Sequence, residues 1–170
     1  GGSSGRLFQT LRIEKGYTYG AYSGYQNSLE VAPFTVRTSV RANATFKSLK
    51  IIQEMLQGYA NDYSEADVLL TKNKLLKADT RAFESLGAKL GMLRTMSKYK
   101  KPSNYAENDQ AELVSMTLAD YKTTISQYLQ ESEMIYVVVG DKATQFEEVK
   151  KLGKPVIELD IYGNAIANKS

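Results

Sequence analysis

The chain has 170 residues, of which 42% are hydrophobic and 24% are charged, and this composition is that of a folded protein rather than a disordered one. Its 22 basic residues exceed its 19 acidic residues by only three and are spread along the chain, so the charge indicates neither a nucleic acid nor an anionic membrane as a partner. Cysteine and histidine are both absent, which excludes disulfides, thiolate metal sites and the usual histidine-dependent catalytic triads.

The N-terminal quarter predicts a short helix followed by two strands. Apolar residues at helical spacing predict a helix of about three turns that stops at Gly16. Aromatic or apolar residues then alternate with other types along 17–26 and 34–41. These two runs predict an antiparallel pair joined by a polar turn around Asn27 and Ser28.

The middle of the chain predicts helices. Apolar residues over 46–59 recur with the period of a helix that buries one side. A capping box of Ser64 and Asp67 begins a second helix, whose apolar positions extend almost to Tyr99. Further helices are expected at 105–114, at 118–129 with a cap formed by Thr117 and Asp120, and in a short segment ending at Leu152.

Two more strands are predicted near the C-terminus. The run "MIYVVVGD" at 134–141 is almost continuously apolar, as in a strand covered on both faces. The segment "VIELD" at 156–160 is the last predicted strand. This order of elements predicts one α+β domain over residues 1–170, with helices packed on one face of a largely antiparallel sheet.

A cluster of tyrosines is the first candidate for a site. Tyr17, Tyr19, Tyr22 and Tyr25 fall in one predicted strand, close in sequence to Arg12. They would bring hydrogen-bond donors and a permanent cation to one surface. The same pattern is also that of packing residues after an ordinary surface helix, with the glycine and serine residues at the start as a tag remnant, and both interpretations stay open.

The order of residues in "GGSSGRLFQTLRIEKGYTYG", at 1–20, resembles a motif in the C-terminal half of the insulinase and pitrilysin family of zinc peptidases, which includes the mitochondrial processing peptidases. The likeness continues, mainly in pattern and order, through "YSEADVLLTKNKLLKA", "SMTLADYKTTISQYL", "MIYVVVGD" and "IELDIYGN". Ile13 stands where the family often has an acidic residue, and Gly5 stands where a serine is common. The chain also starts inside the motif, so the strands that precede it in the family domain are expected to be missing.

The resemblance implies a C-terminal domain without a metal, because the family's inverted His-x-x-Glu-His zinc motif is absent from a chain that has no histidine. It also implies that Arg12 and Tyr19 are catalytic and reach the backbone of a peptide substrate, with Tyr17 as the alternative to Tyr19 if the turn aligns differently. A phenol and a guanidinium can stabilise negative charge on a carbonyl oxygen without titrating. The zinc would lie in a separate N-terminal domain or subunit.

The expected partners are this zinc-bearing domain or subunit and a peptide substrate. A nucleic acid is not expected, because the small basic excess is spread along the chain. A membrane span is not expected either, since no apolar run approaches about 20 residues. A sheet that lacks its leading strands has an exposed edge, so self-association through that edge is expected too. Two alternatives stay open, a non-catalytic family subunit that binds peptides as a scaffold and an unrelated tyrosine-rich binding module. Bacterial cytoplasm and periplasm are both compatible with the sequence.

Overall fold

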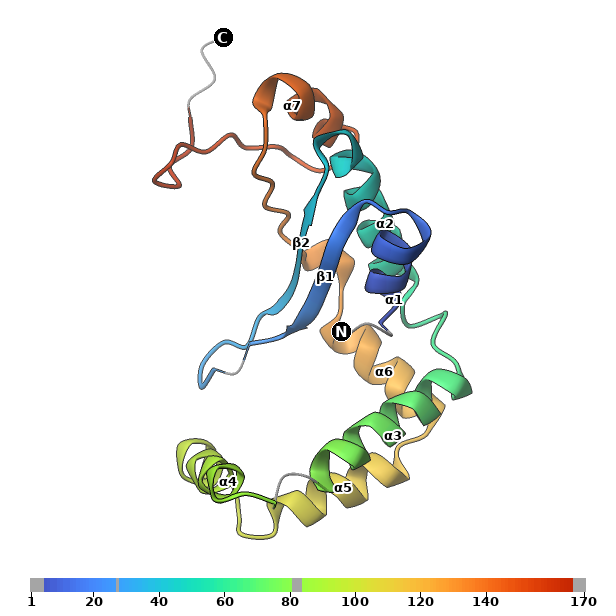
Figure 1. Ribbon diagram of the computed structural model, residues 1–170, viewed down its shortest axis with the longest axis vertical. Coiled ribbons are helices and arrows are strands. Elements are labelled where there is room, and N and C mark those ends of the chain that lie inside the picture. The colour runs from blue at the N-terminus through green and yellow to red at the C-terminus, as the bar shows by residue number, and fades with distance from the viewer. Residues whose placement is uncertain (1–4, 27, 81–83, 167–170) are drawn as a thin grey trace. The chain divides into compact units, whose positions relative to one another are not determined.

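The computed structural model describes residues 5–26, 28–80 and 84–166 (Figure 1). The glycine and serine start of the opening motif at 1–4 and the predicted turn residue Asn27 therefore lie outside the described residues. The chain divides into two compact units, of which the first is Gly1–Gly24, Thr35–Met55 and Ile135–Ser170 and the second is Tyr25–Phe34 and Leu56–Met134. The two units are described one at a time.

The first unit contains most of a two-stranded antiparallel sheet and the helices around it (Figure 1). The elements are α1 (Arg6–Phe8), the π-helix η1 (Gln9–Glu14), β1 (Thr18–Tyr25), β2 (Phe34–Val40), η2 (Ala42–Ala44), most of α2 (Thr45–Gly58) and α7 (Lys142–Lys150). The buried apolar side chains of this unit come from helices and from β1: Leu11, Ala21, Ala44, Ile52 and Val149. The predicted N-terminal helix, strand pair and amphipathic helix over 46–59 are confirmed, with the difference that much of the first helix is a π-helix.

The second unit is helical. Its helices are α3 (Glu65–Thr80), α4 (Leu86–Tyr99), α5 (Tyr105–Ser115), α6 (Leu118–Tyr128) and the short η3 (Glu131–Glu133). Tyr63, Val68 and Tyr121 form its buried centre, where the rings of Tyr63 and Tyr121 stack with their centroids 5.6 Å apart. α3 contacts both α5 and α6 there. None of the helices in the described part of the chain combines the length and the apolar character that a membrane span needs.

The predicted capping boxes are both present, but one predicted helix is two helices. At the start of α3, the Ser64 backbone N–H donates to the Asp67 carboxylate at 2.9 Å, and the matching box of Thr117 and Asp120 opens α6. The helix predicted to run from Ser64 almost to Tyr99 is wrong in extent. α3 ends at Thr80 and α4 starts anew at Leu86, because the Ser85 hydroxyl accepts a hydrogen bond from Ala88 N–H at 3.1 Å and so caps a separate helix.

The two predicted C-terminal strands are wrong. Residues 134–139 form no strand, and 156–160 contribute a single antiparallel bridge between Leu159 and Ala165. The side chains expected to be covered are instead exposed by 90%, 78% and 96% at Ile135, Val137 and Val139. A strand requires hydrogen-bonded neighbours, and the described residues supply none to this segment, so the sheet they form has two strands rather than four.

The capping box of α6 makes one part of the stability depend on pH. The pKa of Asp120 is lowered, first because the Thr117 backbone N–H donates to its carboxylate and second because the Thr117 hydroxyl does so too. A carboxyl whose pKa is lower in the folded state contributes stability above its unfolded pKa of about 3.9, and this contribution is lost as the pH falls through the folded pKa. When the pH is lowered from about 5 to about 3, we therefore expect the free energy of unfolding to fall less for Asp120→Asn than for the parent.

Urea denaturation at several pH values measures this difference. Glu107→Gln is the matched control, since Glu107 is an exposed carboxylate of α5 that accepts no hydrogen bond from the described residues and should leave the parent's acid sensitivity unchanged. An equal loss of stability on acidification for Asp120→Asn and the parent would show that the box does not contribute in this way.

Candidate functional site

The candidate site is built on the helix, turn and strand that contain Arg12 and Tyr19. η1 is a π-helix, in which Lys15 N–H donates to the carbonyl five residues earlier, at Thr10, over 3.0 Å. π-Helical turns are rare in proteins, and those that do occur are often found at functional sites. The local geometry therefore marks the stretch that the resemblance singles out.

The turn after η1 fixes the helix to the start of the strand. Gly16 has a φ of 60°, the left-handed conformation that favours glycine after a helix, and its N–H donates to the Arg12 carbonyl at 3.1 Å. Tyr17 N–H donates to the Leu11 carbonyl at 2.8 Å, and the Leu11 side chain is fully buried. The backbone at Arg12 is therefore held at the helix end and tied to the residues that lead into β1.

The Arg12 side chain is exposed, and its guanidinium stacks on the ring of Phe8. Its guanidinium carbon lies 4.9 Å from the centre of the Phe8 ring, one helical turn earlier. Stacking of this kind is favourable and restricts the rotation of a long side chain. The guanidinium is a cation that can donate two parallel hydrogen bonds to a carboxylate.

Tyr19 lies on β1 and is almost fully exposed, with 94% of its surface accessible. The residue before it, Thr18, is buried and donates through its hydroxyl to the Ser39 carbonyl at 2.6 Å. The Thr38 hydroxyl lies 3.1 Å from that of Thr18, so polar contacts join β1 to β2 directly beside Tyr19. The phenol is therefore carried by a firmly paired stretch of backbone while remaining open to a ligand.

The other three tyrosines do not share this environment. Tyr17 is half-buried and precedes β1, with its carbonyl accepting from Arg41 N–H at 3.2 Å. The Tyr22 ring lies over Gly20, where an added Cβ would meet the phenol oxygen at 2.9 Å. Tyr25 belongs to the second unit, and its hydroxyl donates to the Tyr128 carbonyl at 3.1 Å. Partial burial raises the pKa of Tyr25, with a smaller contribution from Tyr128.

The structure places the residues of the predicted cluster in different environments. Arg12 and Tyr19 are both exposed on one continuous helix, turn and strand, with six residues between them. Tyr17 and Tyr25 differ from Tyr19 in burial or in hydrogen bonding, so the alternation of the sequence does not produce four equivalent donors. The π-helix is the feature that the sequence pattern missed, because a search for a 3.6-residue period does not detect one inserted residue.

Zinc does not fit the residues present. No three Asp or Glu side chains in the described part of the chain are close enough together to hold a metal ion, and the sequence has neither histidine nor cysteine. The nitrogen and sulfur ligands that zinc prefers are thus absent. Any catalysis by these residues alone has to use hydrogen bonds and charge.

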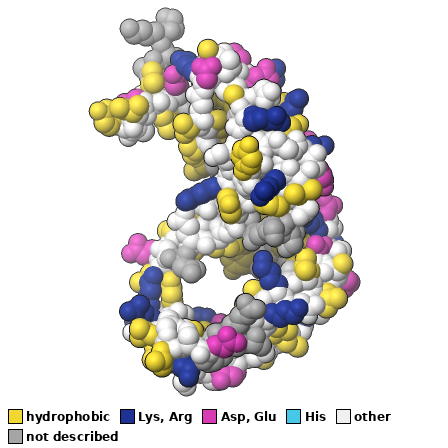
Figure 2. Space-filling model, viewed as in Figure 1, with side chains coloured by type: hydrophobic (Ala, Val, Ile, Leu, Met, Phe, Trp, Pro, Cys, Tyr) yellow, Lys and Arg dark blue, Asp and Glu magenta, His cyan; other side chains and the backbone are white. Residues whose placement is uncertain are grey.

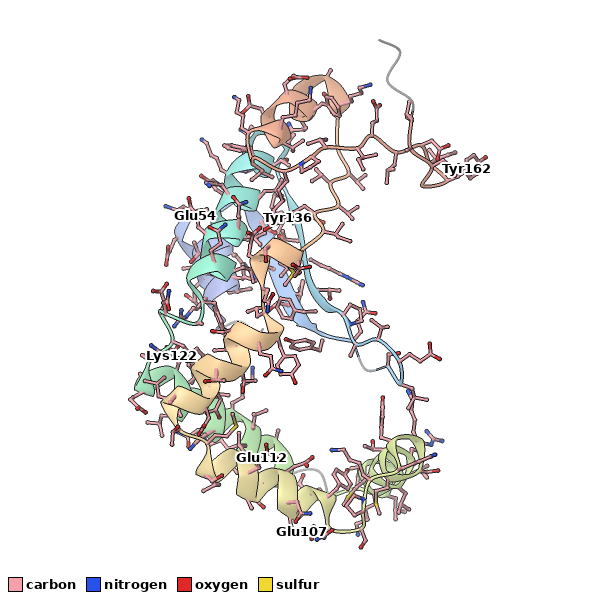
Figure 3. All side chains as sticks on the ribbon, turned by 180° about the vertical axis from the view of Figure 1, so that it is seen from behind. Glu54, Glu107, Glu112, Lys122, Tyr136 and Tyr162 are labelled. Atoms are coloured by element: carbon pink, nitrogen blue, oxygen red, sulfur yellow. The ribbon has the colours of Figure 1, made fainter. Side chains whose placement is uncertain are left out.

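A second candidate, a shallow hollow of the second unit, has no comparable chemistry. It is lined by Ala60, Asn61, Lys122, Thr123, Ser126 and Gln127. Lys122, labelled on α6 in Figure 3, already donates to the Asn61 carbonyl at 3.1 Å. The hollow is therefore lined by neutral groups and by one lysine that already donates a hydrogen bond within the chain. These groups do not indicate a particular ligand.

Comparison with known proteins agrees with the N-terminal motif. Residues 1–75 match the family model described as the peptidase M16 inactive domain. The fold is similar to the crystal structure of a peptidase M16 inactive domain from Pseudomonas fluorescens, with a TM-score of 0.70 and 26% identity over 77% of this chain. This chain spans 31% of that relative, and no curated protein matches it significantly. The predicted resemblance to the C-terminal, inactive domain of the M16 peptidases, the insulinase family, is therefore confirmed.

Proposed function

We propose that residues 1–170 are a single C-terminal, substrate-binding domain, or part of one, of an insulinase-type zinc metallopeptidase, and that Arg12 and Tyr19 contribute to its active site. The observation that carries this proposal is the anchored helix, turn and strand, which holds an exposed guanidinium and an exposed phenol. The zinc belongs to a separate domain or subunit, since the described residues of this chain do not fit it.

The chemistry of the pair suits the cleavage of a peptide bond. When the carbonyl carbon of a peptide is attacked, negative charge develops on its oxygen, and donors fixed in advance near that position lower the barrier. The Tyr19 hydroxyl donates one hydrogen bond to this oxygen. Arg12 holds the substrate backbone through its guanidinium, and Tyr17, which is half-buried, has a smaller part in binding.

The alternative is a non-catalytic subunit that binds peptides as a scaffold for a separate zinc subunit. The description of the matching family model as an inactive domain favours it. Both proposals include peptide binding by Arg12 and Tyr19, and they differ in what loss of the pair does to turnover. In a scaffold the loss raises KM and leaves kcat unchanged, whereas in a shared active site kcat falls as well.

The segment at 134–139 supports the expected partner contact. Its exposed Ile135, Val137, Val138 and Val139 are β-branched, a residue type that favours strands. We propose that a strand of the zinc-bearing domain or subunit, or of a second copy of this chain, pairs here. Sedimentation of the free chain over a range of concentrations tests the second of these options.

Replacement of Arg12 tests the proposed function. In the complete peptidase, whether one polypeptide or reconstituted from subunits, we expect Arg12→Ala to lower kcat/KM by at least about tenfold, with part of the change in KM, because the guanidinium also binds the ground-state backbone. Arg37→Ala is the matched control, since Arg37 is an exposed arginine on β2 of the same sheet and has no assigned role. Tyr17→Phe should change kcat/KM less than Arg12→Ala does. Equal kcat/KM values for Arg12→Ala and Arg37→Ala, per folded molecule, would contradict the proposal.

A further inference from the structure

α4 has two apolar sides, and one of them is uncovered. Met92, Met96 and Tyr99 are half-buried along one side of the helix. Along another side, residues spaced by four and three form an apolar stripe. Their exposed fractions are 85%, 49% and 61% for Leu86, Leu90 and Leu93. The helix is well defined, with the Ser85 cap at its start and Lys100 in the left-handed conformation at its end.

The charged residues of α4 and of the segment that follows it are all basic. From 85 to 106 the sequence contains no Asp or Glu and five cations: Lys89, Arg94, Lys98, Lys100 and Lys101. At about 100° per residue, Lys89 and Arg94 flank the leucine stripe on its two sides. Neither forms a hydrogen bond or an ion pair with the described residues, whereas Lys101 pairs with Asp109 at 2.8 Å. Figure 2 shows the basic and hydrophobic side chains interleaved over α4.

We propose that α4 is the docking site for an acidic amphipathic helix of another protein. The leucine stripe supplies the apolar anchors that a helix partner needs, and the unpaired Lys89 and Arg94 require a partner with carboxylates on both sides of its own apolar stripe. A lipid surface suits this helix less well, because the leucines span only about 60° of its circumference, narrower than the face of about 100° or more expected of an amphipathic helix. The proposal lies outside the Arg12 and Tyr19 site and does not depend on it.

A fluorescein-labelled peptide tests the proposal with the complete 170-residue chain. The probe has about 18 residues, long enough to form a helix on binding, with leucine at every third or fourth position and glutamate elsewhere. Fluorescence anisotropy should show saturable binding that weakens at high salt, since ion pairs at the rim are screened. The same peptide with lysine in place of glutamate should bind at least about tenfold more weakly.

Two double variants locate the contact. Leu90→Ser with Leu93→Ser, and Lys89→Glu with Arg94→Glu, should each weaken binding of the acidic peptide by at least about tenfold. Leu69→Ser on α3 and Lys47→Glu on α2 are matched controls at exposed positions and should bind as the parent does.

Two results would overturn the proposal. Equal binding of the lysine and glutamate peptides would remove the charge complementarity. Absence of peptide binding together with binding to phosphatidylserine vesicles that the leucine variants abolish would make α4 a membrane-surface helix instead.

Discussion

Replacing Tyr19 with phenylalanine is expected to lower kcat of the complete peptidase by about 10²-fold, the scale of effect seen when one oxyanion donor is lost. The change removes the hydroxyl alone and keeps the ring. Since the side chain is 94% exposed and the neighbouring Thr18 and Thr38 hold the strand, the fold and the stability should not change. The effect should therefore fall mainly on turnover, with little change in KM.

Tyr22→Phe is the matched control for this experiment. Tyr22 is another exposed tyrosine of β1, and loss of its hydroxyl should leave kcat at the parent value. Steady-state kinetics on folded, zinc-loaded variants gives the comparison. A kcat for Tyr19→Phe within about threefold of the parent, or about 0.6 kcal/mol of barrier, would rule out a catalytic role and leave the scaffold alternative.

Leu11→Ala is expected to destabilise the chain by about 2–5 kcal/mol, the range for deleting a buried leucine side chain. Leu11 is fully buried within η1, and its carbonyl accepts a hydrogen bond from Tyr17 N–H just before β1. Its removal takes apolar contacts from the core of the first unit and leaves a cavity under the turn that positions Arg12. Urea denaturation followed by circular dichroism measures the loss.

Ile13→Ala provides the comparison for Leu11→Ala. Ile13 belongs to the same π-helix but is exposed, so its truncation should change the free energy of unfolding by no more than about 0.5 kcal/mol. Equal stabilities of the two variants would mean that the core of the first unit does not depend on Leu11.

The features predicted well from the sequence are those that depend on neighbours in the chain. Gly16 adopts the left-handed conformation expected at a helix end, and the boxes at Ser64 and Thr117 form between residues three apart. Such signals are local, and a few residues are enough to determine them. The sequence therefore predicted the type of most helices and the position of several of their starts.

The errors come from features that depend on distant residues. The run at 134–141 has the composition of a covered strand, but composition does not reveal whether strands are present to cover it. Leu86, Leu90 and Leu93 continue the apolar pattern of the preceding helix, and the sequence alone placed them in its buried stripe. The break at Ser85 starts a separate helix, on which the same three leucines are exposed.

The environments of the candidate site residues could be predicted only in part. The resemblance of the opening motif singles out Arg12 and Tyr19, whereas the residue pattern placed all four tyrosines between 17 and 25 in one predicted strand. In the structure Tyr17 is half-buried and the Tyr25 hydroxyl is bound to a carbonyl. The physical reason is that alternation describes the side-chain directions of a regular strand but not which hydroxyls find partners.

The uncovered segment at 134–139 also affects how the free chain behaves during synthesis and storage. Five consecutive residues from Ile135 to Val139 are β-branched or aromatic, uncharged and free of proline, which is the sequence signature of segments that stack into cross-β fibrils. Charged residues flank the segment at Glu131, Glu133 and Asp141, where they act as gatekeepers, since like charges oppose the stacking of identical chains. The free chain is therefore best kept at low concentration until a partner strand is present.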